Sequence, residues 1–245
     1  MFSGHDHAIR YAADPGELDR LCRAFEAAGF LITERDDEGR DSAPTLQKLV
    51  CFADGTYLEL LTVADPAARA RHRLARHMAG QGGWADFTIL TDRLEEAMAV
   101  QRAAGLPVQG PLIHEKRLAD GRPWGVALAL TGIGAGHPVL PFLLEDRMGR
   151  ELRIPLDRAR HPNGATGLAG VVVRTLDLAE AARHYRPLFG EGQAVAGGGR
   201  RYDFAPGAWI ALEEGAGGLS RVILRAAVGT VAAAAVERLG IGFTG

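Results

Sequence analysis

DGTYLELL, residues 54–61, is the stretch that decides the fold. Its Asp54-Gly55 pair predicts a turn, and the residues after it predict a strand. Because side chains alternate between the two faces of a strand, Glu59 shares a face with Tyr57, while leucines fill the other face. Both faces are then largely apolar, which is typical of a strand covered on both sides. An unpaired carboxylate is costly in such a place, so Glu59 is a candidate functional residue.

The composition is that of an ordinary globular protein. Of 245 residues, 47% are hydrophobic and 24% are charged, and the formal net charge is -2. A nucleic-acid-binding protein usually carries a clear basic excess, so this charge argues against one. No apolar run approaches the roughly 20 residues that cross a bilayer, and the opening MFSGHDHAIR lacks the apolar core of a signal peptide. The sequence predicts a cytoplasmic protein without nucleic-acid or membrane partners.

Four segments of the chain begin alike, each with a glycine and a short predicted strand. They are GHDHAIR from Gly4, GWADFTI from Gly83, GLAGVVV from Gly167 and GLSRVIL from Gly218. A candidate helix follows each one, at residues 17–28, 94–104, 178–188 and 231–239. Apolar, strand-like runs follow the first two helices, beginning with GFLITER, residues 29–35. The repeating unit is therefore β-α-β-β-β, present twice in full, a third time in shortened form and a fourth time as its β-α beginning.

These repeats divide the chain into three parts. The first unit occupies residues 1–65 and the second residues 83–156. The arginine-rich stretch between them, residues 66–82, predicts an exposed connecting helix. The shortened third unit and the partial fourth unit occupy residues 167–245. Because the fourth unit is incomplete, one sheet has an unfilled place, which predicts a homodimer.

Tandem β-α-β-β-β units with an acidic residue in the last strand resemble the vicinal oxygen chelate superfamily. The chain is most similar to its glyoxalase-like domain proteins, which share the glyoxalase, bleomycin resistance and extradiol dioxygenase fold. The resemblance is carried by residues 5–30 (HDHAIRYAADPGELDRLCRAFEAAGF), 52–63 (FADGTYLELLTV) and 140–146 (LPFLLED). It implies an α+β fold in which tandem units form half-open, curled mixed sheets around a divalent metal.

The resemblance also implies which residues form the site. In this superfamily the metal ligands come from the first and last strands of each unit, and the metal holds adjacent oxygens of the substrate. His7 and Glu59 would be the ligands of the first unit, and Glu145 would be a ligand of the second. The metal would be Zn, Ni, Mn or Fe, and Glu59 or Glu145 would act as the catalytic base. Three aromatic residues are candidates for contact with the substrate: Tyr57, Phe87 and Trp124.

The second unit lacks the histidine that this family pattern usually supplies. Aligning the opening glycines places Asp86 opposite His7, whereas measuring back from the glycine that ends the helix places Ala85 there. A shift of one residue decides whether a side chain points in or out. His114 could substitute from a neighbouring strand.

Two classes of function stay open. The first is a divalent-metal-dependent isomerase, lyase or epimerase that acts on a small substrate with adjacent oxygens. The second is a metal-free protein that binds or sequesters a small molecule in the same cavity, and the missing histidine favours it. The test is whether His7, Glu59 and Glu145 converge to roughly 2.0–2.2 Å from a common point. The third unit, with Gly170 and Ala211 at the ligand positions, would be structural.

Overall fold

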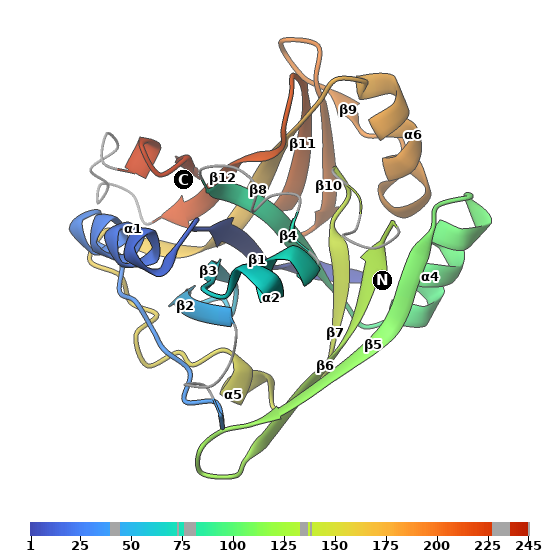
Figure 1. Cartoon of the computed structure of the whole chain (residues 1–245). Helices are drawn as coiled ribbons and strands as arrows, with labels where there is room; N and C mark the ends of the chain where they lie inside the picture. Colours follow the sequence, from blue (N-terminus) through green and yellow to red (C-terminus); the bar gives the residue numbers. More distant parts are fainter. Residues whose placement is uncertain are drawn as a thin grey trace.

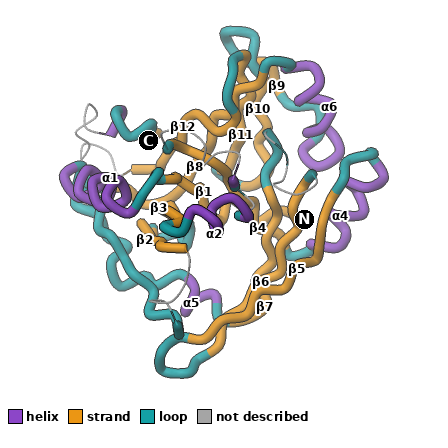
Figure 2. Tube along the Cα trace, in the orientation of Figure 1, coloured by secondary structure: helices purple, strands orange, loops and turns teal. Residues whose placement is uncertain are grey.

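Two curled mixed sheets form the framework of the protein (Figures 1 and 2). The computed structural model describes residues 1–39, 45–72, 74–75, 82–132, 137, 139–226 and 236–244. In hydrogen-bonding order, the strands of the first sheet are β2 (Thr45–Cys51), β3 (Tyr57–Val63), β1 (Phe2–Tyr11), β4 (Gly83–Thr91), β7 (Phe142–Met148), β6 (Pro123–Thr131) and β5 (Val108–Arg117). Those of the second sheet are β13 (Ile241–Thr244), β12 (Gly218–Ala226), β8 (Ala165–Thr175), β11 (Ala208–Glu214), β10 (Arg200–Ala205) and β9 (Gln193–Ala194).

The helices lie around these sheets. They are α1 (Pro15–Ala27), α2 (Pro66–Arg71), α4 (Leu94–Ala103), α5 (Arg150–Arg153) and α6 (Leu178–Phe189). Helices α4 and α6 are neighbours at one side of the molecule, and α1 lies at the other (Figure 1). The helices α1, α4 and α6 occupy the predicted stretches. Asp14 caps α1 and Asp177 caps α6, because each carboxylate accepts a hydrogen bond from the backbone of the first turn.

The same pairing pattern recurs in both sheets and confirms the α+β, glyoxalase-like fold. The first and last strands of a unit pair in parallel, as in β1 with β3, β4 with β7, and β8 with β11. Two units then join through an antiparallel pair of their first strands, β1 with β4 in one sheet and β8 with β12 in the other. Each sheet is therefore built from two units.

The two sheets share one hydrophobic core. The side chains that face it come from both sheets and from the helices α1, α4 and α6; they include Ala8, Leu58, Phe87, Phe25, Met98, Tyr185, Val171, Ile210 and Leu212. The first sheet buries one face in this core. Its other face carries smaller buried clusters, one of them around Ile9, Tyr11 and Leu61, and leaves room for a site beside them.

One predicted strand is replaced by a segment that bonds to the linker after the second unit. The run at residues 29–35 forms only an isolated bridge, between Thr33 and Leu49. Its Leu31 N–H donates instead to His161 Nδ1 at 3.0 Å. Because the Leu31 N–H is bonded to the linker and not to a neighbouring strand, residues 29–35 do not join the sheet as a strand.

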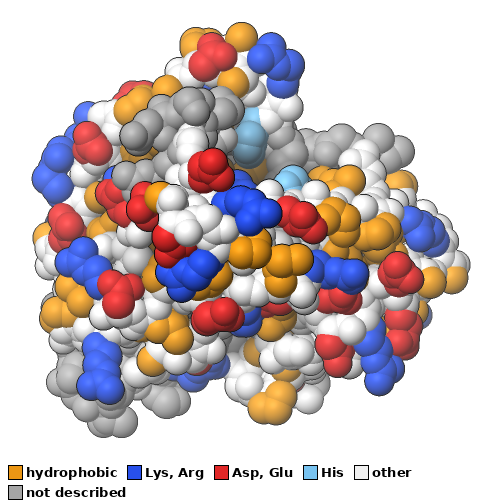
Figure 3. Space-filling view, turned by 90° about the horizontal axis from the view of Figure 1, so that it is seen from below, with side chains coloured by type: hydrophobic (Ala, Val, Ile, Leu, Met, Phe, Trp, Pro, Cys, Tyr) orange, Lys and Arg blue, Asp and Glu red, His pale blue; other side chains and the backbone are white. Residues whose placement is uncertain are grey.

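The fourth unit continues further than predicted, because β13 follows its helical region and pairs in parallel with β12. Residues 231–235 of the predicted fourth helix and residues 73 and 76–81 of the predicted connecting helix lie outside the described residues. None of the helices in the described part of the chain is long and apolar enough to cross a membrane. Acidic and basic side chains are interspersed over the face shown in Figure 3.

His5 is buried where the two sheets meet, and this makes stability depend on pH. Its Nε2 donates to the Trp209 carbonyl at 3.0 Å, and burial lowers the pKa of His5 to about 4. In the unfolded chain His5 binds a proton below about pH 6.5, whereas in the folded chain it stays neutral until the pH approaches 4. The contribution of His5 to the free energy of unfolding is therefore present above pH 6.5 and is lost as the pH falls towards 4. We expect His5 to reduce the free energy of unfolding by about 2 kcal/mol between pH 7.5 and pH 5.

Urea denaturation at these two pH values, on the wild type and His5→Phe, checks this. The variant should lose about 2 kcal/mol less than the wild type over the same interval. His114→Gln, which changes an exposed histidine on β5, is the control and should behave as the wild type does. Equal losses in the wild type and His5→Phe would show that His5 does not carry the effect.

Candidate functional site

A bulge in β1 turns two neighbouring histidines to opposite faces of the first sheet. His5 is opposite Ile89 on β4 and His7 is opposite Thr88, so Asp6 is an extra residue in the ladder. In a regular strand His5 and His7 would share a face. With the bulge, His5 reaches the second sheet and His7 lines a cavity on the free face of the first.

Asp6 fixes the orientation of the His7 ring. Its Oδ2 is 2.7 Å from His7 Nδ1. Because an ionised carboxylate only accepts hydrogen bonds, Nδ1 carries a proton, and Nε2 is the ring nitrogen on the other side, next to Thr88 and Glu59. Thr88 Oγ1 lies 3.2 Å from Nε2, and Glu59 Oε2 lies 3.7 Å from it. His7 Nε2 therefore lies between the Thr88 hydroxyl and the Glu59 carboxylate.

Arg150 and Arg153, the first and last residues of α5, hold Asp6 in its charged form. Asp6 is fully buried, and it accepts hydrogen bonds from Arg153 at 2.7 and 2.9 Å and from Arg150 at 3.0 Å. Burial alone would raise the pKa of Asp6, but the charge of Arg153 and the hydrogen bond from His7 outweigh it and hold the pKa well below its usual range. Arg153 also bonds to Asp146 at 2.8 Å. The second unit thereby anchors the first strand of the first unit.

Glu59 faces the same cavity from β3, and its side chain is 16% exposed. When the Gln47 amide is oriented to satisfy both its neighbours, it donates to Glu59 Oε1 at 2.9 Å and accepts from Arg35. Glu59 is therefore tolerated in an apolar strand because it opens to a cavity and has an amide donor beside it. This answers the question that its position in DGTYLELL raises.

Aromatic side chains form the walls of the cavity, which has a volume of about 190 Å³. Tyr57 stacks on His7, with 4.6 Å between ring centroids and 18° between planes, and the edge of Phe142 meets His7 at 5.5 Å. Trp124 donates from Nε1 to Asp37 at 3.0 Å. The space equals that of about six water molecules, so the enclosed part suits a small molecule.

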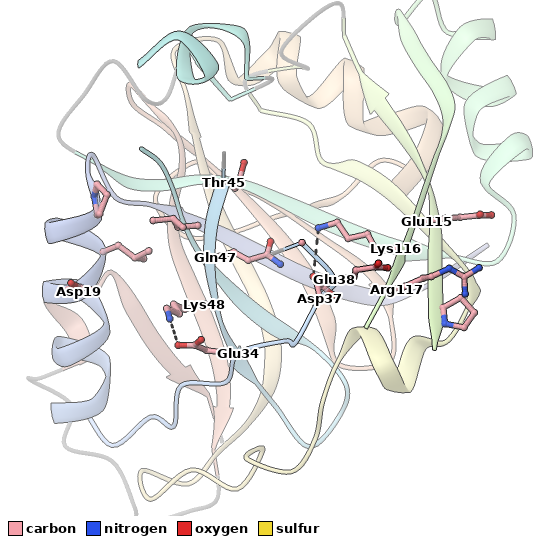
Figure 4. A pocket seen from close by; sticks show the side chains of 15 residues that line it. Asp19, Glu34, Asp37, Glu38, Thr45, Gln47, Lys48, Glu115, Lys116 and Arg117 are labelled. Carbon is pink, nitrogen blue, oxygen red and sulfur yellow. Dashed lines mark hydrogen bonds and ion pairs between the residues drawn. The ribbon is translucent and has the colours of Figure 1, made fainter. Parts of the chain in front are cut away.

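The cavity opens into a broader groove of about 950 Å³ between α1, β2 and β5 (Figure 4). Gln47 and Lys116 line both spaces, so they mark the passage from one to the other. In Figure 4, Lys116 reaches from β5 towards Asp37, and Lys48 is paired with Glu34 on the other side of the groove.

Two of the predicted site residues lie away from the cavity. On β7, Phe142 and Leu144 line it, and the alternation of the strand turns Glu145 to the other side. There Glu145 accepts a hydrogen bond at 3.1 Å from the N–H of Leu94, the first residue of α4. Phe87 is buried in the core shared by the two sheets. The structure brings together His7, Glu59, Tyr57 and Trp124 from the predicted set, with His114 also on the lining.

Sequence reasoning missed the polar residues that support the site. The alternation of β2 could have pointed to Gln47, since Leu49, two residues on, is directly opposite Glu59. Arg153 ends a helix of four residues that shows no periodicity, so no pattern marks it. Asp6 was hidden by the bulge. Asp86 and Ala85, the two candidates for the position opposite His7, are not among the residues that line the cavity.

These residues do not fit a divalent metal. His7 and Glu59 supply two ligand atoms, whereas such an ion usually takes three or four from the protein. His114 also lines the cavity, but it is not grouped with these two side chains as a metal ligand would be. The β4 residue opposite His7 is Thr88, and the β7 side chains on the lining are Phe142 and Leu144. Within the described ranges, no three His, Cys, Asp or Glu side chains are grouped to hold a metal. The predicted ligand set of His7, Glu59 and Glu145 is not assembled.

The comparison with known families agrees with the fold. The model of the glyoxalase-like domain matches residues 5–189. The chain belongs to the glyoxalase-like domain family. It is thereby a member of the vicinal oxygen chelate superfamily. No curated protein matches its sequence.

Solved structures share the fold of this glyoxalase-like protein. A hypothetical protein from Staphylococcus aureus has a TM-score of 0.68 at 16% identity, over 92% of each chain. A mutant of 4-hydroxymandelate synthase from Streptomyces coelicolor has a TM-score of 0.58 at 15% identity, over 98% of this chain and 74% of that one. A fusion of a xylose isomerase-like TIM barrel with 4-hydroxyphenylpyruvate dioxygenase has a TM-score of 0.61 at 12% identity, over 98% of this chain and 39% of that one.

Replacing Asp6 should separate its two roles. We expect Asp6→Asn to lower the free energy of unfolding by about 3–5 kcal/mol, because Arg153 loses a buried partner. The neutral amide can donate to Nδ1, so the proton of His7 should redistribute towards Nε2. Nitrogen-15 NMR of the imidazole measures this redistribution, and urea denaturation measures the stability.

Asp146→Asn is the matched control, since Asp146 also pairs with Arg153 and Arg150 but does not touch His7. It should destabilise the protein and leave the His7 tautomer unchanged. The same tautomer in the wild type and Asp6→Asn would contradict the role given to Asp6.

Proposed function

We propose that this glyoxalase-like protein binds a small organic molecule in the cavity of the first sheet without a metal. The observation that carries the proposal is the pair of polar groups, His7 Nε2 and Glu59 Oε2, 3.7 Å apart in a cavity with aromatic walls. Small-molecule sites are typically apolar enclosures with a few placed polar groups. The ligand would turn a hydroxyl or N–H group towards this pair and pack its apolar part against Tyr57, Trp124 and Phe142.

The same pair supports proton transfer as a second candidate function. Nε2 of His7 can accept a proton from a bound ligand, and Asp6 would stabilise the imidazolium that forms. Glu59 lies near enough to stabilise this cation or to take the proton itself. Such chemistry would suit an isomerase or epimerase that works with these side chains alone. A metal-dependent isomerase or lyase is not favoured, since Glu145 accepts from the first residue of α4 instead, and His114 is not grouped with His7 and Glu59 to hold a metal.

Two statements about the setting of the protein remain predictions. We expect a cytoplasmic protein, and we expect a homodimer. Light scattering at micromolar concentration checks the second, and a monomer would count against it.

Elemental analysis separates the proposal from the metalloenzyme alternative. We expect purified wild-type protein to hold no stoichiometric metal after incubation with manganese, nickel, zinc and iron. Glu59→Gln removes one candidate ligand, and Glu145→Gln alters a carboxylate outside the cavity as the matched control. Near-stoichiometric metal that is present in wild type and Glu145→Gln but lost in Glu59→Gln would overturn the proposal.

Binding is tested with a library of fragments, neutral and acidic, followed by NMR shift titration. Fragments that bind should shift resonances of Tyr57 and His7. Their affinity should fall by about tenfold in Glu59→Gln, because a hydrogen bond to a charged acceptor is weakened, and should change less than twofold in Glu145→Gln. A library without any binder in the cavity would contradict the proposed function.

A further inference from the structure

The positively charged side chains that line the cavity differ in how many hydrogen bonds they already donate to other residues of the protein. Arg35 donates from Nε to both oxygens of Asp37 at 2.9 Å and from NH1 to the Arg153 carbonyl at 3.0 Å. Arg153 donates to Asp6, Asp146 and the Tyr57 hydroxyl. The side chains of both arginines are at least 94% buried. Both guanidinium groups are thus held by neighbouring residues of the protein.

Lys116 is different. Its side chain is 49% exposed, and its Nζ is 3.7 Å from Asp37, too far for a hydrogen bond. Asp37 does not depend on it, because Arg35 and the Trp124 indole already donate to both carboxylate oxygens. The Lys116 ammonium makes no hydrogen bond to the described residues, although it lies 5.7 Å from the Trp124 ring centroid. Its three donors are therefore available at the mouth of the cavity.

The two arginines of the lining are each hydrogen-bonded to a carboxylate that is not itself on the lining, Arg153 to Asp6 and Arg35 to Asp37. Among the described residues, the Glu59 carboxylate at the floor and the Lys116 ammonium at the mouth line the cavity without a hydrogen bond to an oppositely charged side chain. Glu59 requires a donor from the ligand, and Lys116 requires an acceptor that is best charged.

We infer that the ligand is a small organic acid that carries a hydroxyl or N–H group, and that Lys116 binds its carboxylate. This inference rests on the proposed small-molecule function of the cavity. The hydroxyl or N–H group meets Glu59 and His7, the carbon skeleton lies between the aromatic walls, and the carboxylate lies where the cavity opens beside Gln47. Lys116 thus decides which molecules are accepted, because an amine at the same place would meet an unfavourable like charge.

Matched probes test the inference: 3-hydroxybenzoate and its neutral analogue 3-hydroxybenzamide, titrated by NMR into the full-length protein. The wild type should bind the acid more tightly than the amide, and added salt should narrow the difference. Lys116→Gln should weaken binding of the acid about tenfold and change that of the amide less than twofold. Lys116→Arg keeps the charge and should restore most of the affinity for the acid.

Lys48→Gln is the control variant, since Lys48 lines the groove, is paired with Glu34 and does not line the cavity. It should leave both affinities within twofold of the wild type. If the amide binds as well as the acid, or if Lys116→Gln affects both equally, the cavity still binds small molecules but the role of Lys116 is overturned. If neither these probes nor any fragment of the library binds, the proposed function fails and the inference fails with it.

Discussion

The ion pair between Asp6 and Arg153 is the contact on which the site depends. It joins the first strand of the first unit to the short helix that follows the last strand of the second. Removing either partner would take one of its two ion-pair partners from a buried charge, since Asp6 also bonds to Arg150 and Arg153 also bonds to Asp146, and would cost several kcal/mol. The pair therefore couples folding of the two units to the orientation of His7, which contacts Asp6 on its other side.

The bulge in β1 makes this contact available. It adds one residue to the strand, so that His7 lines the cavity and Asp6 bonds to its ring, while His5 lies in the core between the sheets. Two histidines of one strand thus have different roles. Burial keeps His5 neutral, whereas His7 has a carboxylate on each side of its ring.

The second sheet has side chains at the place that corresponds to the cavity of the first sheet. In the second sheet, Gly170 is paired with Trp209 of β11, and a Cβ at Gly170 would collide with the indole ring. The guanidinium carbon of Arg201 lies over the same indole, 4.4 Å from the ring centroid. The corresponding place is therefore filled by side chains of the chain itself, as expected for a unit with Gly170 and Ala211 where ligands would stand.

The fold could be predicted from the sequence because its repeats carry glycines, helices and strands in the same order. The site could be predicted only in part. Glu59 stood out because a carboxylate in an apolar strand needs a reason, and strand alternation gave its face correctly. Glu145 occupies a similar strand, but alternation decides by a single residue, and Leu144 takes the inward position. The role of Arg153 depends on its long-range contact with Asp6, which no local sequence pattern encodes.

Two chains of hydrogen-bonded polar side chains end at His7 and Glu59 in the cavity. One runs from Arg153 through Asp6 to His7, and the other runs from Asp37 through Arg35 and Gln47 to Glu59. They are tied together where Arg35 donates to the Arg153 carbonyl. Each acceptor is thereby oriented when the protein folds, so a ligand does not have to order these side chains on binding. In the proposed binding mode the two ends of the cavity have different roles: the ordered polar groups at the floor fix the position of the ligand, and the half-exposed Lys116 at the mouth selects its charge.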